Sequence, residues 1–182
     1  MRKLYRLLRY DWPLHFVLLF TNWLPDNVAF IRLRGWLARP FFRKCGKKLG
    51  LGRNLTFYNC SNISIGDWVY IANGCWFSAG KEIAIEDEVL IGPQTVIATT
   101  NHTLKNGSYR FGIPHGRSVR IGKGCWIGAH CVILQGVSLG NTTVIGANSV
   151  INQSVPSYSI IAGNPAKLIK TVSPDKSQDH GA

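Results

Sequence analysis

The histidine at position 102 is the residue of this chain best placed for acid–base chemistry. It follows Thr99, Thr100 and Asn101, at the point where a regular repeat gives way to a long irregular segment. Imidazole titrates near neutral pH, so a histidine held at the end of a rigid strand beside a loop is well suited to act as a general base. We therefore predict that His102 removes a proton from a substrate group.

Two other histidines bear on the chemistry. His115 lies in the irregular segment, and we predict that it contacts the substrate. His130 belongs to the regular repeat and has a weaker case. A zinc site of the carbonic-anhydrase kind would need three converging histidines. His102, His115 and His130 lack that spacing, so we expect no metal.

The cysteines indicate a reducing compartment. There are five of them, an odd number, and none forms a CxxC pair. Cys75, Cys125 and Cys131 each lie four positions after an aliphatic or aromatic residue of the repeat, on a slot that should face inward. We expect buried, reduced core thiols in a cytosolic protein.

The elements that must position these residues follow from a repeat of six. A period of six fits neither an amphipathic helix nor an alternating strand. It is typical of a parallel β-helix, in which three hexapeptides form one coil and stacked coils bury one another's inner face. We predict an all-β fold of this kind. The repeat positions are Ile65, Ile71, Phe77, Ile85, Ile91, Ile97, Ile121, Ile127, Ile133, Leu139, Ile145 and Ile151.

One long break interrupts the repeat. The step from Ile97 to Ile121 is 24 residues, which predicts that a loop at 102–118 is inserted in one coil. Irregular loops of this length are usually functional. The domains that we predict are a basic amphipathic helical segment at 1–48, the β-helix at 49–165, and a short helix with a disordered tail at 166–182.

The N-terminal segment carries most of the positive charge. Residues 1–53 hold twelve Lys or Arg and two Asp, a net of +10 out of +12 for the whole chain. The uncharged stretch from Trp12 to Pro25 is short for a transmembrane helix, which needs about 20 apolar residues. A basic segment rich in Trp is suited to a membrane surface, or to packing across the base of the β-helix or against another subunit. Both interpretations stay open.

Partners and location follow from the same segment. It contains no recognisable nucleic-acid-binding module, so we expect no nucleic acid as a partner. No small-residue cleavage site follows the apolar stretch, which argues against a signal peptide. We expect a cytoplasmic protein, peripheral at the inner face of the cytoplasmic membrane if the segment binds lipid.

The chain resembles the hexapeptide-repeat acyltransferases. The resemblance rests on the repeat, the loop inserted after Asn101-His102, and the closing sequence Ala162-Gly163-Asn164-Pro165-Ala166-Lys167. It covers roughly residues 50–170 and is closest to the maltose and galactoside O-acetyltransferase branch, which includes sugar O-acetyltransferases of surface-polysaccharide pathways. It implies a left-handed β-helix, acetyl-CoA as co-substrate, and a homotrimer with active sites between subunits.

The resemblance also implies roles for single residues. Asn101-His102 matches the family's catalytic histidine motif, in which the histidine takes a proton from the acceptor hydroxyl as it attacks the thioester. Asn73 lies where the branch has an acceptor-binding asparagine, and we group it with Asn101 and His115 as substrate-binding. Ala79-Gly80 stand where the sugar acetyltransferases carry an acidic residue, which leaves the acceptor open.

A second set of residues matches positions that hold acetyl-CoA. Trp126 matches a tryptophan that lines the CoA channel. Ala129 and Ala147 match positions whose main chain binds the pantetheine arm. Lys167 and Lys170 match basic positions near the CoA phosphates, where a charge-assisted contact makes physical sense.

The function that these features predict is acetyl transfer from acetyl-CoA to a sugar hydroxyl, the acceptor being a sugar or a lipid-linked sugar. An N-acetyltransferase of an amino sugar would use the same base, and the sequence does not separate the two. A non-catalytic β-helix trimer is the alternative from another class. The Asn101-His102 pair and the two lysines argue against it.

Overall fold

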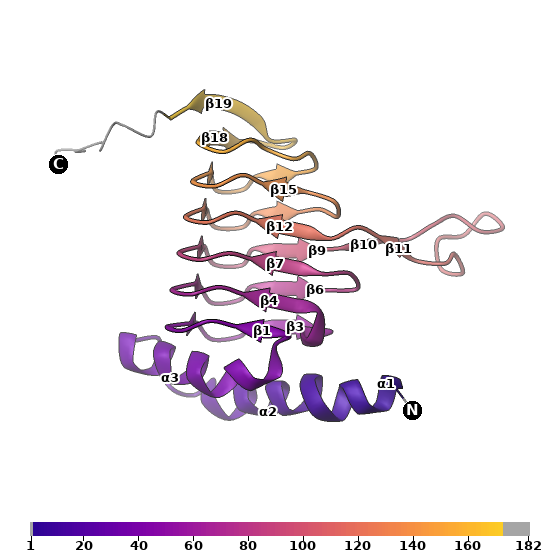
Figure 1. The fold of residues 1–182 in the computed structure, drawn as a ribbon. Coiled ribbons are helices and arrows are strands. Elements are labelled where there is room, and N and C mark those ends of the chain that lie inside the picture. The colour runs from indigo at the N-terminus through magenta and orange to yellow at the C-terminus, as the bar shows by residue number, and fades with distance from the viewer. Residues whose placement is uncertain (1, 173–182) are drawn as a thin grey trace.

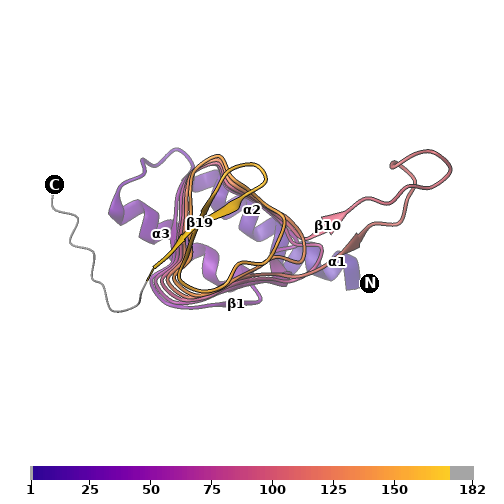
Figure 2. The ribbon, with the colours of Figure 1, turned by 90° about the horizontal axis from the view of Figure 1, so that it is seen from above.

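A stack of flat coils rises from a layer of helices (Figure 1). The computed structural model describes residues 2–172. Each coil contributes one short strand to each of three sheets, and neighbouring coils pair in parallel. Seen from above, the coils superpose as the outline of a prism (Figure 2). The predicted parallel β-helix is confirmed.

The three sheets follow the chain in rotation. The first sheet contains β1 (Lys44–Cys45), β4 (Ile63–Ile65), β7 (Ile83–Ile85), β12 (Val119–Ile121) and β15 (Ser138–Leu139). The second contains β2 (Gly50–Leu51), β5 (Tyr70–Ile71), β8 (Leu90–Ile91), β13 (Trp126–Ile127), β16 (Val144–Ile145), β18 (Ser159–Ala162) and β19 (Lys167–Thr171). The third contains β3 (Thr56–Tyr58), β6 (Trp76–Ser78), β9 (Val96–Ala98), β14 (Val132–Ile133) and β17 (Val150–Ile151).

Three corners join these sheets. We call the corner between the first and second sheets the first corner, that between the second and third sheets the second corner, and that between the third and first sheets the third corner. At the first corner one residue of each coil adopts a left-handed backbone; these residues are Lys48, Trp68, Glu88, Gly124, Thr142 and Tyr158. The tight turn imposes this conformation, although it is unfavourable for side chains other than glycine.

The core is a set of ladders of identical positions. Ile71, Ile91, Ile127 and Ile145 lie in register on the second sheet and are buried. The inward slots of Cys75, Cys125 and Cys131 are buried, as predicted. The equivalent positions in other hexapeptides, Thr95, Thr143 and Ser149, are buried as well. Since each coil covers the next, no coil needs a core of its own.

The helices close the lower end of the stack (Figure 1). They are α1 (Arg2–Arg6), the π-helical turn η1 (Leu7–Asp11), α2 (Trp12–Thr21), α3 (Val28–Ala38) and the 3-10 turn η2 (Arg39–Phe41). Another 3-10 turn, η3 (Cys60–Asn62), joins β3 to β4 at the third corner. Leu14, Leu18 and Ala38 are buried in the same cluster as the repeat residues. The helices therefore pack across the base of the β-helix, one of the two roles left open by the sequence.

The structure corrects the predicted boundaries. The β-helix begins at β1 (Lys44–Cys45) rather than at residue 49, because β1, β2 and β3 pair with the next coil. The short helix predicted within 166–182 is wrong for residues 167–171, which form β19. This strand pairs antiparallel with β18 and so provides hydrogen-bond partners for the backbone groups on the outer edge of β18. The predicted disordered tail from residue 173 lies outside the described residues.

Candidate functional site

The loop inserted in the third coil begins as an antiparallel ladder. β10 (Thr100–Asn101) pairs with β11 (His115–Gly116), with Asn101 opposite His115. The ladder projects from the third corner, away from the prism (Figure 2). His102 directly follows β10, and its side chain is exposed. The fold thus brings together the three residues Asn101, His102 and His115.

A buried threonine anchors the root of this ladder. The Thr99 hydroxyl accepts a hydrogen bond from the Lys81 N–H at 2.8 Å and donates to the Ser78 carbonyl at 2.9 Å. The Thr99 carbonyl accepts from the Arg117 N–H at 3.0 Å, so both strands of the ladder are held at one residue. A side chain at Gly116 would overlap the Thr99 carbonyl oxygen, which explains the glycine. The strand end beside His102 is therefore rigidly placed.

A small hollow of about 190 Å³ lies beside this root. Thr100, Asn101, Arg117 and Gln135 contribute polar groups to its lining. The Gln135 amide nitrogen is 3.5 Å from His115 Nε2, which ties the ladder to the coil above. Sequence reasoning missed Gln135, because it occupies an ordinary corner position of the repeat and only the fold brings it beside His115.

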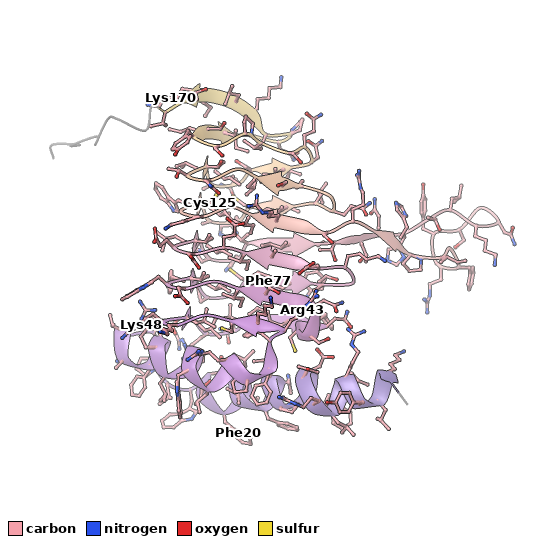
Figure 3. The ribbon with its side chains drawn as sticks, viewed as in Figure 1. Phe20, Arg43, Lys48, Phe77, Cys125 and Lys170 are labelled. Carbon is pink, nitrogen blue, oxygen red and sulfur yellow. The ribbon has the colours of Figure 1, made fainter. Side chains whose placement is uncertain are left out.

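Trp126 lies on a different side of the prism. It belongs to β13 in the second sheet and is 56% exposed, so its ring faces outward. Val144 of β16 pairs with Trp126, Ile160 of β18 pairs with Val144, and Lys170 of β19 pairs with Ile160. The indole therefore begins an outward column that ends at Lys170. Lys170 lies near the top of the stack (Figure 3).

The second corner presents open backbone amides, among them those of Ala129 and Ala147. At the first corner, the N–H groups at the corresponding places donate to side chains of the next coil, such as Lys123 to Asn141 Oδ1 at 3.1 Å. Within residues 2–172, the N–H groups of Ala129 and Ala147 have no such acceptor. The residue above Ala129 is Ala147, and the residue above Ala147 is Gly163, neither of which has a side-chain oxygen. These two amides are free to bind an extended ligand.

The remaining predicted residues are spread over the same side. Lys167 and Lys170 are exposed on β19, Lys167 as its first residue and Lys170 as its fourth. Asn73 lies at the second corner, two coils below Ala129. The Gln94 N–H donates to the Asn73 carbonyl, which places Pro93 directly above Asn73. The His130 N–H donates to the Pro93 carbonyl, which places Ala129 directly above Pro93. Asn73 and Trp126 are thus separated from His102 by the width of one sheet or more within a chain.

The thiols offer no nucleophile at neutral pH. Burial raises the pKa of Cys75 from 9.0 to about 11 and that of Cys45 to about 11, so both stay protonated. Among residues 2–172 no three His, Cys, Asp or Glu side chains converge as a metal site would require.

The comparisons with known proteins agree with this geometry. The family model described as bacterial transferase hexapeptide (six repeats) matches residues 118–153. The galactoside O-acetyltransferase of Escherichia coli K12 is 30% identical over 149 residues, which are 82% of this chain and 66% of that enzyme. A hexapeptide-repeat-containing acetyltransferase of Vibrio cholerae, solved with acetyl-CoA, is 30% identical with a TM-score of 0.79, over 90% of this chain and 87% of that one. This chain belongs to the hexapeptide-repeat acetyltransferases.

A further acetyltransferase structure has a similar fold at lower identity. The maltose O-acetyltransferase of Clostridium difficile 630 is 28% identical with a TM-score of 0.80, over 92% of this chain and 88% of that one. The chain spans 56% to 66% of the length of the curated relatives that it matches. The family predicted from the sequence is confirmed, and the roles of single residues stay predictions.

Proposed function

We propose that this protein transfers an acetyl group from acetyl-CoA to a sugar hydroxyl, in the biosynthesis of a cell-surface polysaccharide or glycolipid. Relatives named galactoside and maltose O-acetyltransferases support the reaction class. The observation that carries the proposal is the exposed His102, placed at the end of β10 by an anchored ladder. A rigidly held, solvent-accessible imidazole is what a general base requires.

The residues of this chain fit acetyl-CoA as co-substrate. The open amides of Ala129 and Ala147 would hold the pantetheine arm, Trp126 would lie along it, and Lys167 and Lys170 would pair with phosphate groups. When bound, acetyl-CoA supplies an activated acetyl thioester. His102 takes the proton of the acceptor hydroxyl, while Asn101 and His115 orient the acceptor beside it. Asn73 would contact the acceptor from the other half of the site.

We also propose that the protein works as a homotrimer with its sites between subunits. The proton-transfer residues project from the third corner, whereas the acetyl-CoA residues lie on the second sheet and second corner. One chain does not bring the two groups together. If the third corner of one copy packs against the second sheet of the next, each contact forms one complete site. Three copies that close into a ring then form three equivalent sites.

The N-terminal segment supports a place for this reaction. We propose that residues 1–48 hold the enzyme at the cytoplasmic face of a membrane, where a lipid-linked sugar would be presented. The support is the net charge of +10 over residues 1–53 together with exposed aromatic side chains on α2 and α3.

The test of the activity is thiol release from acetyl-CoA over a panel of sugars and amino sugars. His102→Ala should lower acceptor-dependent release by about 10²–10⁴-fold, the usual contribution of a general base. His15→Ala removes another exposed histidine, on α2, and serves as the matched control. The preferred acceptor decides between transfer to oxygen and transfer to nitrogen. Release that is equal in wild type and His102→Ala would refute the assigned base.

A further inference from the structure

The underside of the helical layer is a broad apolar surface. α2 and α3 bury one side against the first coil and expose large side chains on the other. Figure 3 shows Phe20 pointing down, away from the stack. We call this surface the apolar base; its exposed members are Trp12, Phe16, Leu19, Phe20, Trp23, Val28, Leu33 and Trp36. A contiguous surface of this kind marks an interaction site.

A cationic cavity opens at the edge of the apolar base. It has a volume of about 570 Å³ and lies between α3 and the first corner. We call it the basic cavity; its lining consists of Val28, Arg32, Trp36, Arg39, Lys47, Lys48, Leu49 and Trp68. Val28 and Trp36 belong to both features, so the cavity continues the apolar base.

Among the residues that the structure describes, the cationic side chains of the basic cavity form no ion pair, although the Asp67 carboxylate accepts a hydrogen bond from the Lys47 backbone N–H at 2.6 Å. Five ion pairs form elsewhere in the described part of the chain, but none involves Arg32, Arg39, Lys47 or Lys48. The Arg39 Nε is buried there and has no hydrogen-bond partner. Four like charges around one hollow repel each other until an anion enters.

The fold holds these cations in place through Trp68. The Arg32 guanidinium lies 5.6 Å from the Trp68 ring centroid, and Lys48 Nζ lies 5.8 Å from it. Lys48 and Trp68 occupy the same left-handed position of successive coils, so the corner itself sets their spacing. Arg32 also donates to the Lys48 carbonyl. The cavity is therefore formed before any ligand arrives.

We propose that the basic cavity binds the phosphate group of an anionic lipid while the apolar base lies in the bilayer interface. An interfacial helix sinks its apolar face about 5–10 Å into the boundary between headgroups and acyl chains. Lys48 stands directly above the helical layer (Figure 3), at the level that the lipid phosphates then occupy. No helix within residues 2–172 is both long and apolar enough to cross a bilayer.

This proposal deepens the membrane association given under Proposed function and rests on it. It adds the ligand, a lipid phosphate, and the side chains that select it. Aromatic and aliphatic groups supply binding to any bilayer, whereas the four cations supply preference for anionic lipid. Each Lys or Arg close to an anionic membrane strengthens binding by about fivefold.

The test is sedimentation of the full chain with vesicles of phosphatidylcholine, with and without phosphatidylglycerol. Replacing Arg39, Lys47 and Lys48 together by Gln should weaken binding to the anionic vesicles by about 100-fold. The matched control replaces Lys81, Lys105 and Arg110 by Gln, which removes the same charge from exposed positions away from the cavity. It should weaken binding by much less. Equal losses in the two variants would overturn the cavity as a site.

Two further arms complete the test. Phe20→Ser with Trp23→Ser should weaken binding to both kinds of vesicle without changing the thermal unfolding midpoint or the oligomeric state. A change of oligomeric state in that variant would make the apolar base a subunit interface and overturn the proposal. Inorganic phosphate added as a competitor should displace little of the protein; full displacement would show a site for free phosphate. Vesicle binding is measured without acetyl-CoA or acceptor, so its result is separate from that of the His102 assay.

Discussion

At the scale of single residues, the inward slots show how the coil handles groups that could react. Cys75 is fully buried, and its thiol donates to the Gly92 carbonyl at 3.2 Å. Burial raises its pKa from 9.0 to about 11 because the thiolate would lose its hydration. Between these values the unfolded chain releases a proton that the folded chain keeps. The stability contributed by this thiol is therefore complete below pH 9 and is lost as pH rises toward 11.

This pH dependence can be measured. The free energy of unfolding should fall between pH 9 and 11, with Cys75 contributing about 2–3 kcal/mol of that loss. In Cys75→Ala the fall should be smaller by that amount, while the loss of buried volume lowers stability equally at every pH. The measurement is denaturant unfolding at a series of pH values. Parallel curves for wild type and Cys75→Ala would contradict the assignment.

Residues that follow the repeat could be predicted from the sequence, and residues defined by tertiary neighbours could not. The inward slots and the loop around His102 were predicted because the six-residue period of the repeat and its interruption between Ile97 and Ile121 are visible in the sequence. Gln135 and the openness of the Ala129 amide were not foreseen from the residues alone. Both depend on which residue lies in the coil above, and no local pattern encodes that.

At the scale of elements, Arg34 joins the helices to the β-helix. Its side chain is fully buried, and it pairs with Asp26 at 3.1 Å. The same guanidinium donates to the carbonyls of Thr21 at 3.1 Å and Leu24 at 3.2 Å, and to that of Leu51 in the first coil. One cation therefore satisfies the carboxyl end of α2 and a strand of the stack. The segment 1–48 looked amphipathic in sequence, and nothing there marked this arginine as buried.

Replacing Arg34 should detach the helical layer. Arg34→Met should cost about 3–5 kcal/mol of unfolding free energy, because it leaves an acid and buried carbonyls without a partner. Arg43→Met is the matched control, since Arg43 pairs with Glu82 at 3.2 Å on the surface, and such pairs contribute about 1 kcal/mol or less. Equilibrium denaturation of both variants decides the matter. Similar losses would mean that the buried network stabilises the fold no more than a surface pair.

Among the strands, too, those that follow the repeat could be predicted from the sequence, and those defined by a tertiary neighbour could not. The predicted repeat positions begin at Ile65 and the predicted β-helix begins at residue 49, so β1 falls outside it although Cys45-Gly46 repeats the pattern. β19 was missed because five exposed residues form a strand only when the edge of β18 is there to pair with.

At the scale of the whole molecule, the two separated groups of site residues make a prediction about mixed oligomers. His102→Ala removes the base, and Trp126→Ala removes a side chain of the other half. If each site joins two copies, a site is intact only where a third corner with native His102 meets a second sheet with native Trp126. In a random mixture of the two variants this happens at about a quarter of the contacts. Co-expression of the two variants should then restore about a quarter of wild-type transfer. Activity no higher than the sum of the separate variants would place a complete site within one chain.

The position of the hairpin along the stack also fixes a height. His102 leaves the third coil, two strand spacings of about 4.8 Å above the first coil, and the helices beneath add about 10 Å. With the apolar base sunk in the bilayer interface and Lys48 of the first coil level with the lipid phosphates, the reacting imidazole stands about 10 Å above those phosphates. A hydroxyl next to the lipid is then out of reach. The enzyme would select acceptors by how far their sugar chain extends from the membrane, independently of which sugar it is.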